Sequence, residues 1–358
     1  GCLKNRHYEE GTTEVIWMKK VLCFGELLLR LPPAHGGVWL KDNQMPVFIG
    51  GAELNVATAL SVWGIPVKYF TALPDNIISK DIIAYLEEKK IDTSAIQLSG
   101  ERIGLYYLQQ GADMKSAENV FDRKNSSFAT QKTGIINWDE VLDDVSWFHF
   151  SAIAPAVSET AAALCAEGLA AAHKKGITIS VDLNHRKLLW QYGKKAAEVM
   201  TALAKYCTVI MGNVWSANSL LEIPVDDNIH KKGQQLDYLL QATNTAKNIF
   251  EKFPNCKWVA NTFRFDGNND KIEYYAALNT VGEQSVSPLF KTESIVERVG
   301  SGDCFMAGLI YGIIQQHTLK NIISLAAGSA FCKLQEVGDA TNNSIQHIQK
   351  IVNRFTND

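Results

Sequence analysis

The 358-residue sequence has almost no excess charge of either sign. Its 35 Lys and Arg residues are balanced by 38 Asp and Glu residues, so the formal net charge is −3. Without a positive field to attract phosphate backbones, the chain is not expected to bind nucleic acid. Hydrophobic residues make up 46% and charged residues 20%, a composition that excludes disorder as the main state and supplies a large core.

Long apolar runs are also missing. The longest uncharged stretch near the C-terminus, Cys304 to Leu319, is too short to cross a bilayer. Residues 1–17 mix charges and contain no apolar core of the kind that signal peptides carry. We therefore expect a cytoplasmic protein that does not associate with membranes. Because the chain begins with Gly, we interpret residues 1–17 as a tag or N-terminal extension and residues 18–358 as the folded domain.

Cysteine pairing patterns are absent as well. The seven cysteines are scattered, odd in number, and form no CxxC motif. Neither a zinc site nor a disulfide framework is supported by such spacing. The sequence predicts reduced thiols packed in the core.

What the sequence does have is an alternation of short apolar runs and helical patterns. The run 21–25 ends at Gly25, as a buried strand would, and a helical pattern from 52 to 63 is followed by another strand at 67–73. This rhythm is typical of an α/β domain with a mainly parallel sheet. Later strands are expected at 147–150, 177–183, 207–211 and 258–262, helices at 79–90, 159–175, 194–205, 232–253, 303–316, 319–334 and 344–354, and an antiparallel strand at 272–278.

Two segments, about 27–49 and 101–128, interrupt this rhythm. Residues 105–108 and 119–121 read as strands joined by a turn at Gly111-Ala112-Asp113, with no helix between them. Together the two segments predict a small separate sheet inserted into the α/β body. Such an insertion often serves as a lid over a cleft.

The segment 298–305 is the most informative of the chain. Gly300, Ser301 and Gly302 form a small glycine-rich turn that leads into an apolar helix beginning near Asp303. Glycines let the backbone approach a ligand, and the first amides of a helix lack internal partners, so they suit an anion such as a phosphoryl group. Taken alone, Asp303 is equally typical of an ordinary acid in a first helical turn.

A second glycine-rich turn occurs early in the chain. Gly50 and Gly51 precede a helical pattern whose first turn contains Glu53 and Asn55. Asn55 could hydrogen-bond a polyol, whereas Glu53 could simply favour the helix dipole.

Taken together and in this order, the two turns resemble the two signatures of the PfkB (ribokinase-like) carbohydrate kinases, and the resemblance covers residues 18–358. It implies a three-layer α/β/α sandwich with a mainly parallel central sheet and a small β-sheet lid. It also implies an ATP-dependent sugar kinase that uses Mg²⁺, in which Asp303 is the catalytic base and the amides of Gly300, Ser301 and Gly302 hold the developing anion.

Further motifs resemble those of the 2-keto-3-deoxygluconate kinases within this family. They lie at residues 104–106, 122–127, 182–190, 298–299 and 338–339. Two arginines reaching one cleft suit the carboxylate of a sugar acid. The resemblance implies phosphorylation of the terminal hydroxyl of 2-keto-3-deoxygluconate, with substrate contacts from Gly50, Gly51, Asn55, Tyr106, Arg123, Arg186 and Asp339.

The sequence departs from this pattern at several positions. Phe121 replaces a tyrosine, and Glu297 replaces an aspartate, common in that subfamily. The family's metal-linked Asn-x-x-Glu is here Asn213 followed by Ser216, so the metal ligands are left unassigned. We expect Asn213, Thr262 and Arg264 to contact the nucleotide, with Arg264 replacing glycine-rich backbone contacts.

Two alternatives stay open from the sequence alone. One is a kinase for a neutral sugar such as fructose or ribose, against which Arg123 and Arg186 argue. The other is a non-catalytic sugar-binding relative. A nicotinamide enzyme is disfavoured because Gly25-Glu26-Leu27 does not begin a GxGxxG motif. By analogy with the family, we also expect a homodimer formed through the lid.

Overall fold

The computed structural model describes residues 19–33, 38–108, 120–266 and 271–357. The predicted turn at residues 111–113 and the N-terminal segment 1–17 lie outside these residues. No helix within the described ranges is both long enough and apolar enough to cross a membrane.

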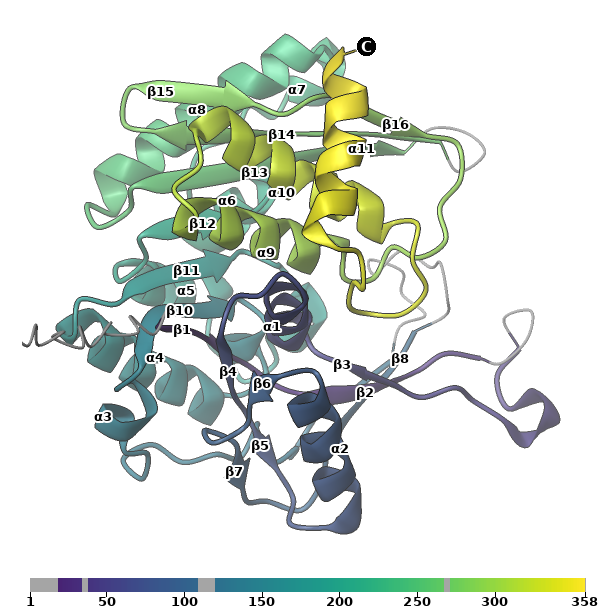
Figure 1. The fold of residues 1–358 in the computed structure, drawn as a ribbon. Helices are drawn as coiled ribbons and strands as arrows, with labels where there is room; N and C mark the ends of the chain where they lie inside the picture. Colours follow the sequence, from purple (N-terminus) through teal and green to yellow (C-terminus); the bar gives the residue numbers. More distant parts are fainter. Residues whose placement is uncertain (1–18, 34–37, 109–119, 267–270, 358) are drawn as a thin grey trace, which may run out of the picture.

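A large sheet forms the centre of the molecule (Figure 1). Seven of its strands are parallel neighbours, and the sheet is extended at one edge by antiparallel strands. The parallel strands are, in spatial order, β6 (Ile91–Asp92), β4 (Val67–Phe70), β1 (Lys20–Phe24), β10 (Val145–Ser151), β11 (Thr178–Asp182), β12 (Val209–Met211) and β13 (Trp258–Asp266). The antiparallel strands are β14 (Ile272–Thr280), β15 (Glu283–Val286) and β16 (Phe290–Thr292).

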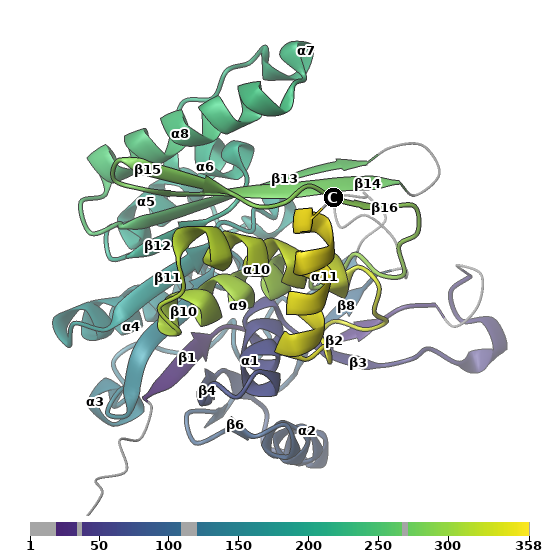
Figure 2. The same ribbon diagram turned by 45° about the horizontal axis from the view of Figure 1, so that its top comes forward.

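Helices cover both faces of this sheet, because its central strands are apolar on both sides. Alternate side chains of β1 enter two different cores: Val21 and Cys23 point into one, Leu22 and Phe24 into the other. The predicted three-layer α/β/α sandwich is thereby confirmed (Figure 2). The first core holds α1 (Ala52–Val62), α2 (Ile77–Glu88), α9 (Ser301–Ile314), α10 (Leu319–Lys333) and α11 (Ile345–Asn357). The second holds α3 (Trp138–Val141), α4 (Glu159–Lys174), α5 (Ala196–Ala204), α6 (Val214–Leu221) and α8 (Gln235–Lys252).

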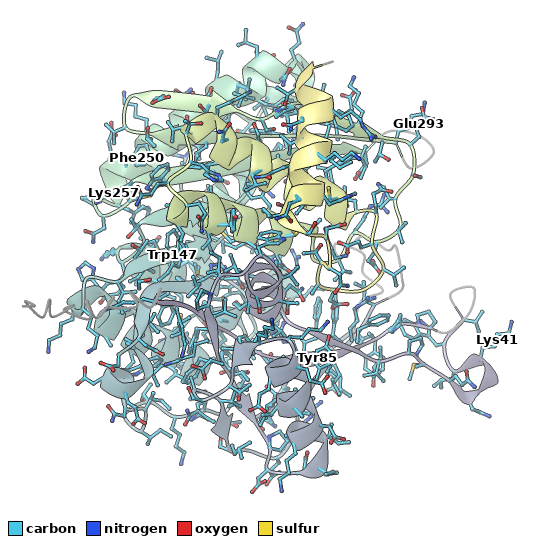
Figure 3. The ribbon with its side chains drawn as sticks, in the orientation of Figure 1. Lys41, Tyr85, Trp147, Phe250, Lys257 and Glu293 are labelled. Carbon is cyan, nitrogen blue, oxygen red and sulfur yellow. The ribbon has the colours of Figure 1, made fainter. Side chains whose placement is uncertain are left out.

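The small separate sheet also exists, and its strands lie in the two segments predicted to form a lid, except that β3 extends one residue further, to Gly50. Its order is β3 (Phe48–Gly50), β2 (Leu28–Leu31), β8 (Gly104–Tyr107) and β9 (Val120–Asp122). The chain around the short helix η1 (Lys41–Asn43) projects away from the body, with Lys41 at its far end (Figure 3). The remaining short elements are β5 (Ala72–Leu73), β7 (Gln97–Leu98), η2 (Ala154–Ala156), η3 (Lys187–Leu189) and α7 (Ile229–Lys232).

Two element boundaries differ from the prediction for identifiable reasons. The helix expected at 232–253 begins only at Gln235, as α8, because Gly233 adopts a left-handed φ of 68° and donates its amide to Ile229 O, which ends the preceding short helix α7. The strand expected to end at Thr262 continues to Asp266, because its antiparallel pairing with β14 extends that far. The cysteines of the described ranges are all buried and unpaired, as predicted.

Candidate functional site

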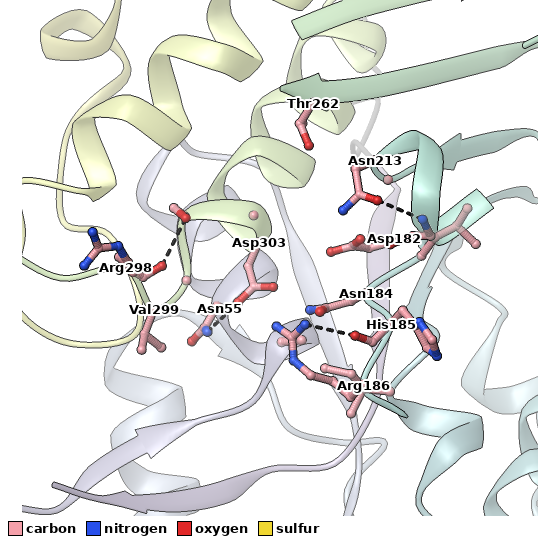
Figure 4. A pocket seen from close by; sticks show the side chains of 18 of the residues that line it. Asn55, Asp182, Asn184, His185, Arg186, Asn213, Thr262, Arg298, Val299 and Asp303 are labelled. Carbon is pink, nitrogen blue, oxygen red and sulfur yellow. Dashed lines mark hydrogen bonds between the residues drawn. The ribbon is translucent and has the colours of Figure 1, made fainter. Parts of the chain in front are cut away.

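A cavity of about 500 Å³ opens at the carboxyl ends of the parallel strands (Figure 4). In open α/β sheets this edge is where ligands bind. Every predicted site residue except Gly50 contributes to the cavity wall. Gly50 instead packs behind it, because a Cβ at that position would lie 2.6 Å from Asp339 Oδ2. The predicted wall residues are Gly51, Asn55, Tyr106, Arg123, Arg186, Asn213, Thr262, Arg264, Gly300, Ser301, Gly302, Asp303 and Asp339.

The turn before α9 has the conformation that its glycines suggested. Gly300 has a φ of 77°, and a Cβ there would overlap the carbonyl oxygen of Asp339. The Ser301 hydroxyl donates to Arg298 O at 3.0 Å, which closes the turn. At Gly302 a Cβ would meet no atom within 4 Å. The first amides of α9 therefore lie at the cavity wall, in the geometry of a helix N-terminal anion site.

Asp303 and Asn55 face each other in this cavity. The Asn55 side-chain amide donates to Asp303 Oδ2 at 2.7 Å. Burial raises the pKa of Asp303 to about 7, although the hydrogen bond from Asn55 works in the opposite direction. Asn55 is brought there by Gly51, whose φ of 142° and close approach to Glu26 O exclude a side chain at the start of α1. A carboxyl group with this pKa can accept a proton near neutral pH.

A second carboxylate, Asp182 at the end of β11, lies on the opposite wall (Figure 4). It is only 6% exposed. Burial, reinforced by the nearby Asp303 charge, raises the pKa of Asp182 well above its usual range. Residue 182 belongs to a segment that the sequence singled out, but no role was assigned to it.

The two arginines expected at the sugar both line the cavity, in different surroundings. Arg123, which follows β9, donates through Nε to Glu26 Oε2 at 2.5 Å, and both side chains are buried. Its charge is thus already balanced within the protein. Arg186 follows β11 and donates to the carbonyl oxygen of His185. Its positive charge acts on Asp303, Asp182 and Tyr106, which places it at the centre of the site.

Tyr106 and Phe121, on the neighbouring lid strands β8 and β9, stack with ring centroids 5.1 Å apart and nearly parallel planes. Burial raises the pKa of Tyr106, so its hydroxyl stays protonated at neutral pH. That hydroxyl has no hydrogen-bond partner among the residues that the structure describes. It is a donor available to a ligand.

Asp339 has a structural partner that the sequence did not suggest. Arg30 on β2 donates through Nε to Asp339 Oδ1 at 2.7 Å and lies 3.5 Å from Glu297 Oε2. All three side chains are buried, and the Arg30 guanidinium also lies 4.5 Å from the centre of the Phe48 ring. Through Arg30, this cluster joins the small sheet to the segment before α9, which holds Glu297, and to the segment after α10, which holds Asp339.

The residues expected at the nucleotide occupy the other end of the cavity. Asn213 caps α6 by accepting the Ser216 amide at 2.8 Å, so its side-chain oxygen has a structural role. Arg264 on β13 forms a 3.4 Å ion pair with the partly exposed Asp266. Thr262 lies on β13, two residues before Arg264, and its side chain also lines the cavity (Figure 4).

These features combine a proton acceptor, an anion-binding helix end and several cations in one partly closed cavity. Such a set can bind two negatively charged molecules and transfer a charged group between them.

Comparison with solved structures and other proteins agrees with this geometry. The crystal structure of a 2-dehydro-3-deoxygluconokinase from Thermotoga maritima is 30% identical, covers 94% of this chain and 99% of its own, and superposes with a TM-score of 0.83. A 2-dehydro-3-deoxygalactonokinase from Haloferax volcanii is 24% identical over 93% of this chain and 96% of its own. A putative ribokinase II from E. coli, solved in complex with ATP and Mg²⁺, shares the fold at 16% identity, with a TM-score of 0.70 over 94% of this chain and 99% of its own.

The sequence model of the family described as "pfkB family carbohydrate kinase" matches residues 18–247 and 274–346 of this chain. These ranges hold both glycine-rich turns, Asp182 and Asp303. The chain therefore belongs to the PfkB family of carbohydrate kinases.

Proposed function

We propose that this carbohydrate kinase phosphorylates the terminal hydroxyl of a 2-keto-3-deoxy sugar acid, with 2-keto-3-deoxygluconate as the first candidate. The observation that carries the proposal is the place of Arg186 in the same cavity as the Asn55–Asp303 pair. A cation beside the proposed base suits a substrate that brings its own carboxylate. Two relatives described above, the 2-dehydro-3-deoxygluconokinase of Thermotoga maritima and the 2-dehydro-3-deoxygalactonokinase of Haloferax volcanii, are named for substrates of this class.

The reaction follows from the groups on the cavity wall. The Asp303 carboxylate accepts the proton of the terminal hydroxyl, and the freed oxygen attacks the γ-phosphorus of ATP. The bond between that phosphorus and the bridging oxygen breaks, and ADP leaves with the bonding electron pair. The amides at the start of α9, beside Gly300 and Gly302, stabilise the charge on the phosphoryl oxygens during transfer.

The substrate is positioned by groups from both the lid and the body. Tyr106 offers its unpartnered hydroxyl from the lid, and Asn55 offers its side-chain oxygen, which also has no partner among the described residues. Arg186 attracts the carboxylate. Arg123 orients the substrate through hydrogen bonds. It adds little net positive charge to the site, because Glu26 already balances its guanidinium.

The nucleotide is expected at the opposite end, near Thr262 and Arg264. Among the described residues Arg264 forms a single ion pair, with the partly exposed Asp266, so its guanidinium can also bind a phosphate. Mg²⁺ bound with ATP supplies positive charge that offsets the charge of the phosphates. Substituting Arg264→Ala should raise the KM for ATP, and an unchanged KM would remove this role.

A neutral-sugar kinase is the alternative, because Arg123 is not available as a free charge. ADP release coupled to a dye signal, measured with 2-keto-3-deoxygluconate, 2-keto-3-deoxygalactonate, fructose and ribose, separates the two. The proposal expects the sugar acids to have the highest kcat/KM. A preference for fructose or ribose would overturn it, and no turnover with any sugar would favour a non-catalytic relative.

Substituting Arg186 tests whether this residue causes the preference for sugar acids. Arg186→Ala should raise the KM for the sugar acid by about 10–100-fold, the loss expected for a hydrogen bond to a charged group, and change the KM for fructose far less. Arg354→Ala, which removes an exposed arginine of α11 away from the cavity, is the matched control. Equal effects of Arg186→Ala on both sugars would contradict recognition of a carboxylate.

A further inference from the structure

Asp182 is a buried residue, 6% exposed, whose side chain lines the cavity and has no partner among the described residues. Among the residues that the structure describes, no hydrogen bond or ion pair reaches its side chain, although Arg186 and Asp303 act on it electrostatically. A buried charge is costly unless it is paired or binds a metal. The cost is larger here because the second carboxylate, Asp303, faces the same cavity.

The other buried carboxylates around the cavity each have at least one hydrogen-bond donor within the protein, although Glu26 Oε1 itself receives none from the described residues. Asp303 accepts from Asn55, Glu26 from Arg123, Asp339 from Arg30, and Glu53 from the hydroxyl and amide of Ser151. Asp182 differs from them because neither of its carboxylate oxygens has a hydrogen-bond or ion-pair partner within the described part of the chain. An exception of this kind points to a partner that comes from outside the protein.

The surroundings of Asp182 indicate what that partner is. Its carboxylate projects into the cavity between Asn184 and Asn213, on the side that faces Asp303 (Figure 4). Carboxylate and amide oxygens are hard ligands of the kind that Mg²⁺ prefers. Arg186 and Arg264 also line this cavity and suit anions, so one cavity can hold both a phosphate chain and a cation.

We propose that Asp182 is the protein carboxylate that holds the divalent cation accompanying the nucleotide. This assignment rests on the proposed kinase function. Ser216 cannot take this role as a glutamate would, because a hydroxyl carries no charge. No group of three or more His, Cys, Asp or Glu side chains within the described residues is arranged to hold a metal ion. One carboxylate, completed by phosphate oxygens and water, matches the way Mg²⁺ is usually bound at nucleotide sites.

The decisive experiment measures metal binding in the absence of sugar. Free Mn²⁺ is followed by electron paramagnetic resonance while it is titrated into the protein with an ATP analogue whose γ-phosphoryl cannot be transferred. Asp182→Asn should weaken Mn²⁺ binding at least tenfold. Asp75→Asn, which removes an exposed carboxylate far from the cavity, should not change it. Equal Mn²⁺ affinity in Asp182→Asn and the unaltered protein would overturn the proposal.

The affinity for the analogue without metal provides the second readout. Removing a negative charge near the phosphates should leave metal-free binding unchanged or make it tighter, so the effect of Asp182→Asn should differ between metal-free and metal-loaded conditions. The same change in both conditions would mean that Asp182 acts only as a charge or a structural residue, and would overturn the assignment.

A measurement on the unaltered protein covers the case in which Asp182→Asn does not fold. In crystals with Mn²⁺ and the ATP analogue, anomalous scattering should place the ion about 2 Å from an Asp182 oxygen. An ion bound elsewhere in the cavity would refute the assignment. Metal at Asp182 in a protein that phosphorylates no sugar acid would support this site and overturn the proposed substrate, so the two failures are distinguishable.

Discussion

The side chains of Asn55 and Asp303, 248 residues apart in sequence, are joined by a hydrogen bond of 2.7 Å. One residue lies on α1 and the other on α9, two helices that pack against each other on one face of the sheet. The contact brings the two glycine-rich turns of the chain together at a single point. It also leaves one oxygen of Asp303 open to a substrate.

The first prediction concerns turnover. Asp303→Asn keeps the size and the hydrogen-bonding capacity of the side chain but removes the proton acceptor. We expect kcat to fall by about 10²–10⁴-fold, the usual contribution of a general base, while the KM for the sugar changes little. Steady-state kinetics with the best sugar of the panel measures both. Turnover close to that of the unaltered enzyme would exclude Asp303 as the base.

The pH profile is the second prediction. The reaction needs Asp303 as the carboxylate, and its pKa is about 7, so log kcat/KM should rise with pH up to about 7 and then level off. Asn55→Leu removes the hydrogen bond that lowers this pKa, so the midpoint should move to higher pH. Asn248→Leu on the exposed side of α8 is the control. A profile that is flat between pH 5 and 8 would contradict the role of Asp303.

Stability should show the opposite trend, which is the third prediction. The pKa of Asp303 is about 7 in the folded protein and near 3.8 when unfolded, so the folded state binds more protons between these values. The contribution of this group is present below pH 3.8 and is lost as pH rises through 7. Asp303→Asn should therefore raise Tm at pH 8 more than at pH 5.

Thermal unfolding of both proteins at the two pH values checks this prediction. Asp75→Asn, whose carboxylate is exposed, should show no such difference between the two pH values. A lower Tm for Asp303→Asn at pH 8 would show that the buried carboxylate stabilises the fold. In that case Asp303 would not lower the free energy of unfolding, and no loss of stability at this site would be attributable to catalysis.

Local patterns explain how much of the site could be predicted. The turns at Gly51 and Gly300 are recognisable because each needs a positive φ and a close backbone approach, and glycine is the residue that permits both. The strands were predictable because a parallel strand covered on both faces is a continuous apolar run. Gly233, by contrast, lay inside a pattern that otherwise read as one helix.

Pairs that are distant in sequence could not be predicted in the same way. Arg30 is 309 residues from Asp339, and Arg123 is 97 residues from Glu26. A charged residue in a sequence does not reveal its partner, so the sequence predicts a substrate contact for Arg123 but not its ion pair with Glu26. The unpaired state of Asp182 is likewise a property of the packed structure alone.

The fourth prediction compares two glycines with the same backbone conformation. Gly300 and Gly134 have φ values of 77° and 76°, but a Cβ at Gly134 would meet no atom within 4 Å. Gly134→Ala should therefore cost only the left-handed strain of about 1–2 kcal/mol. Gly300→Ala adds an overlap with the Asp339 backbone, so it should cost more in urea unfolding and abolish turnover. Equal free energies of unfolding for the two variants would show that the turn can relax.

The last prediction is the homodimer through the lid. Leu40, Val47 and Val120, on the lid or the chain that projects from it, are 71%, 58% and 54% exposed. Exposed apolar side chains on a projecting segment are candidates for burial against a partner. Light scattering after size exclusion should give twice the monomer mass of 39.7 kDa.

The double variant Leu40→Glu with Val47→Glu should give the monomer mass, because each carboxylate would have to be buried in the interface. Val281→Glu, at an 80% exposed position remote from the lid, should stay dimeric. If the unaltered protein were a monomer at tens of micromolar, the predicted homodimer would be wrong.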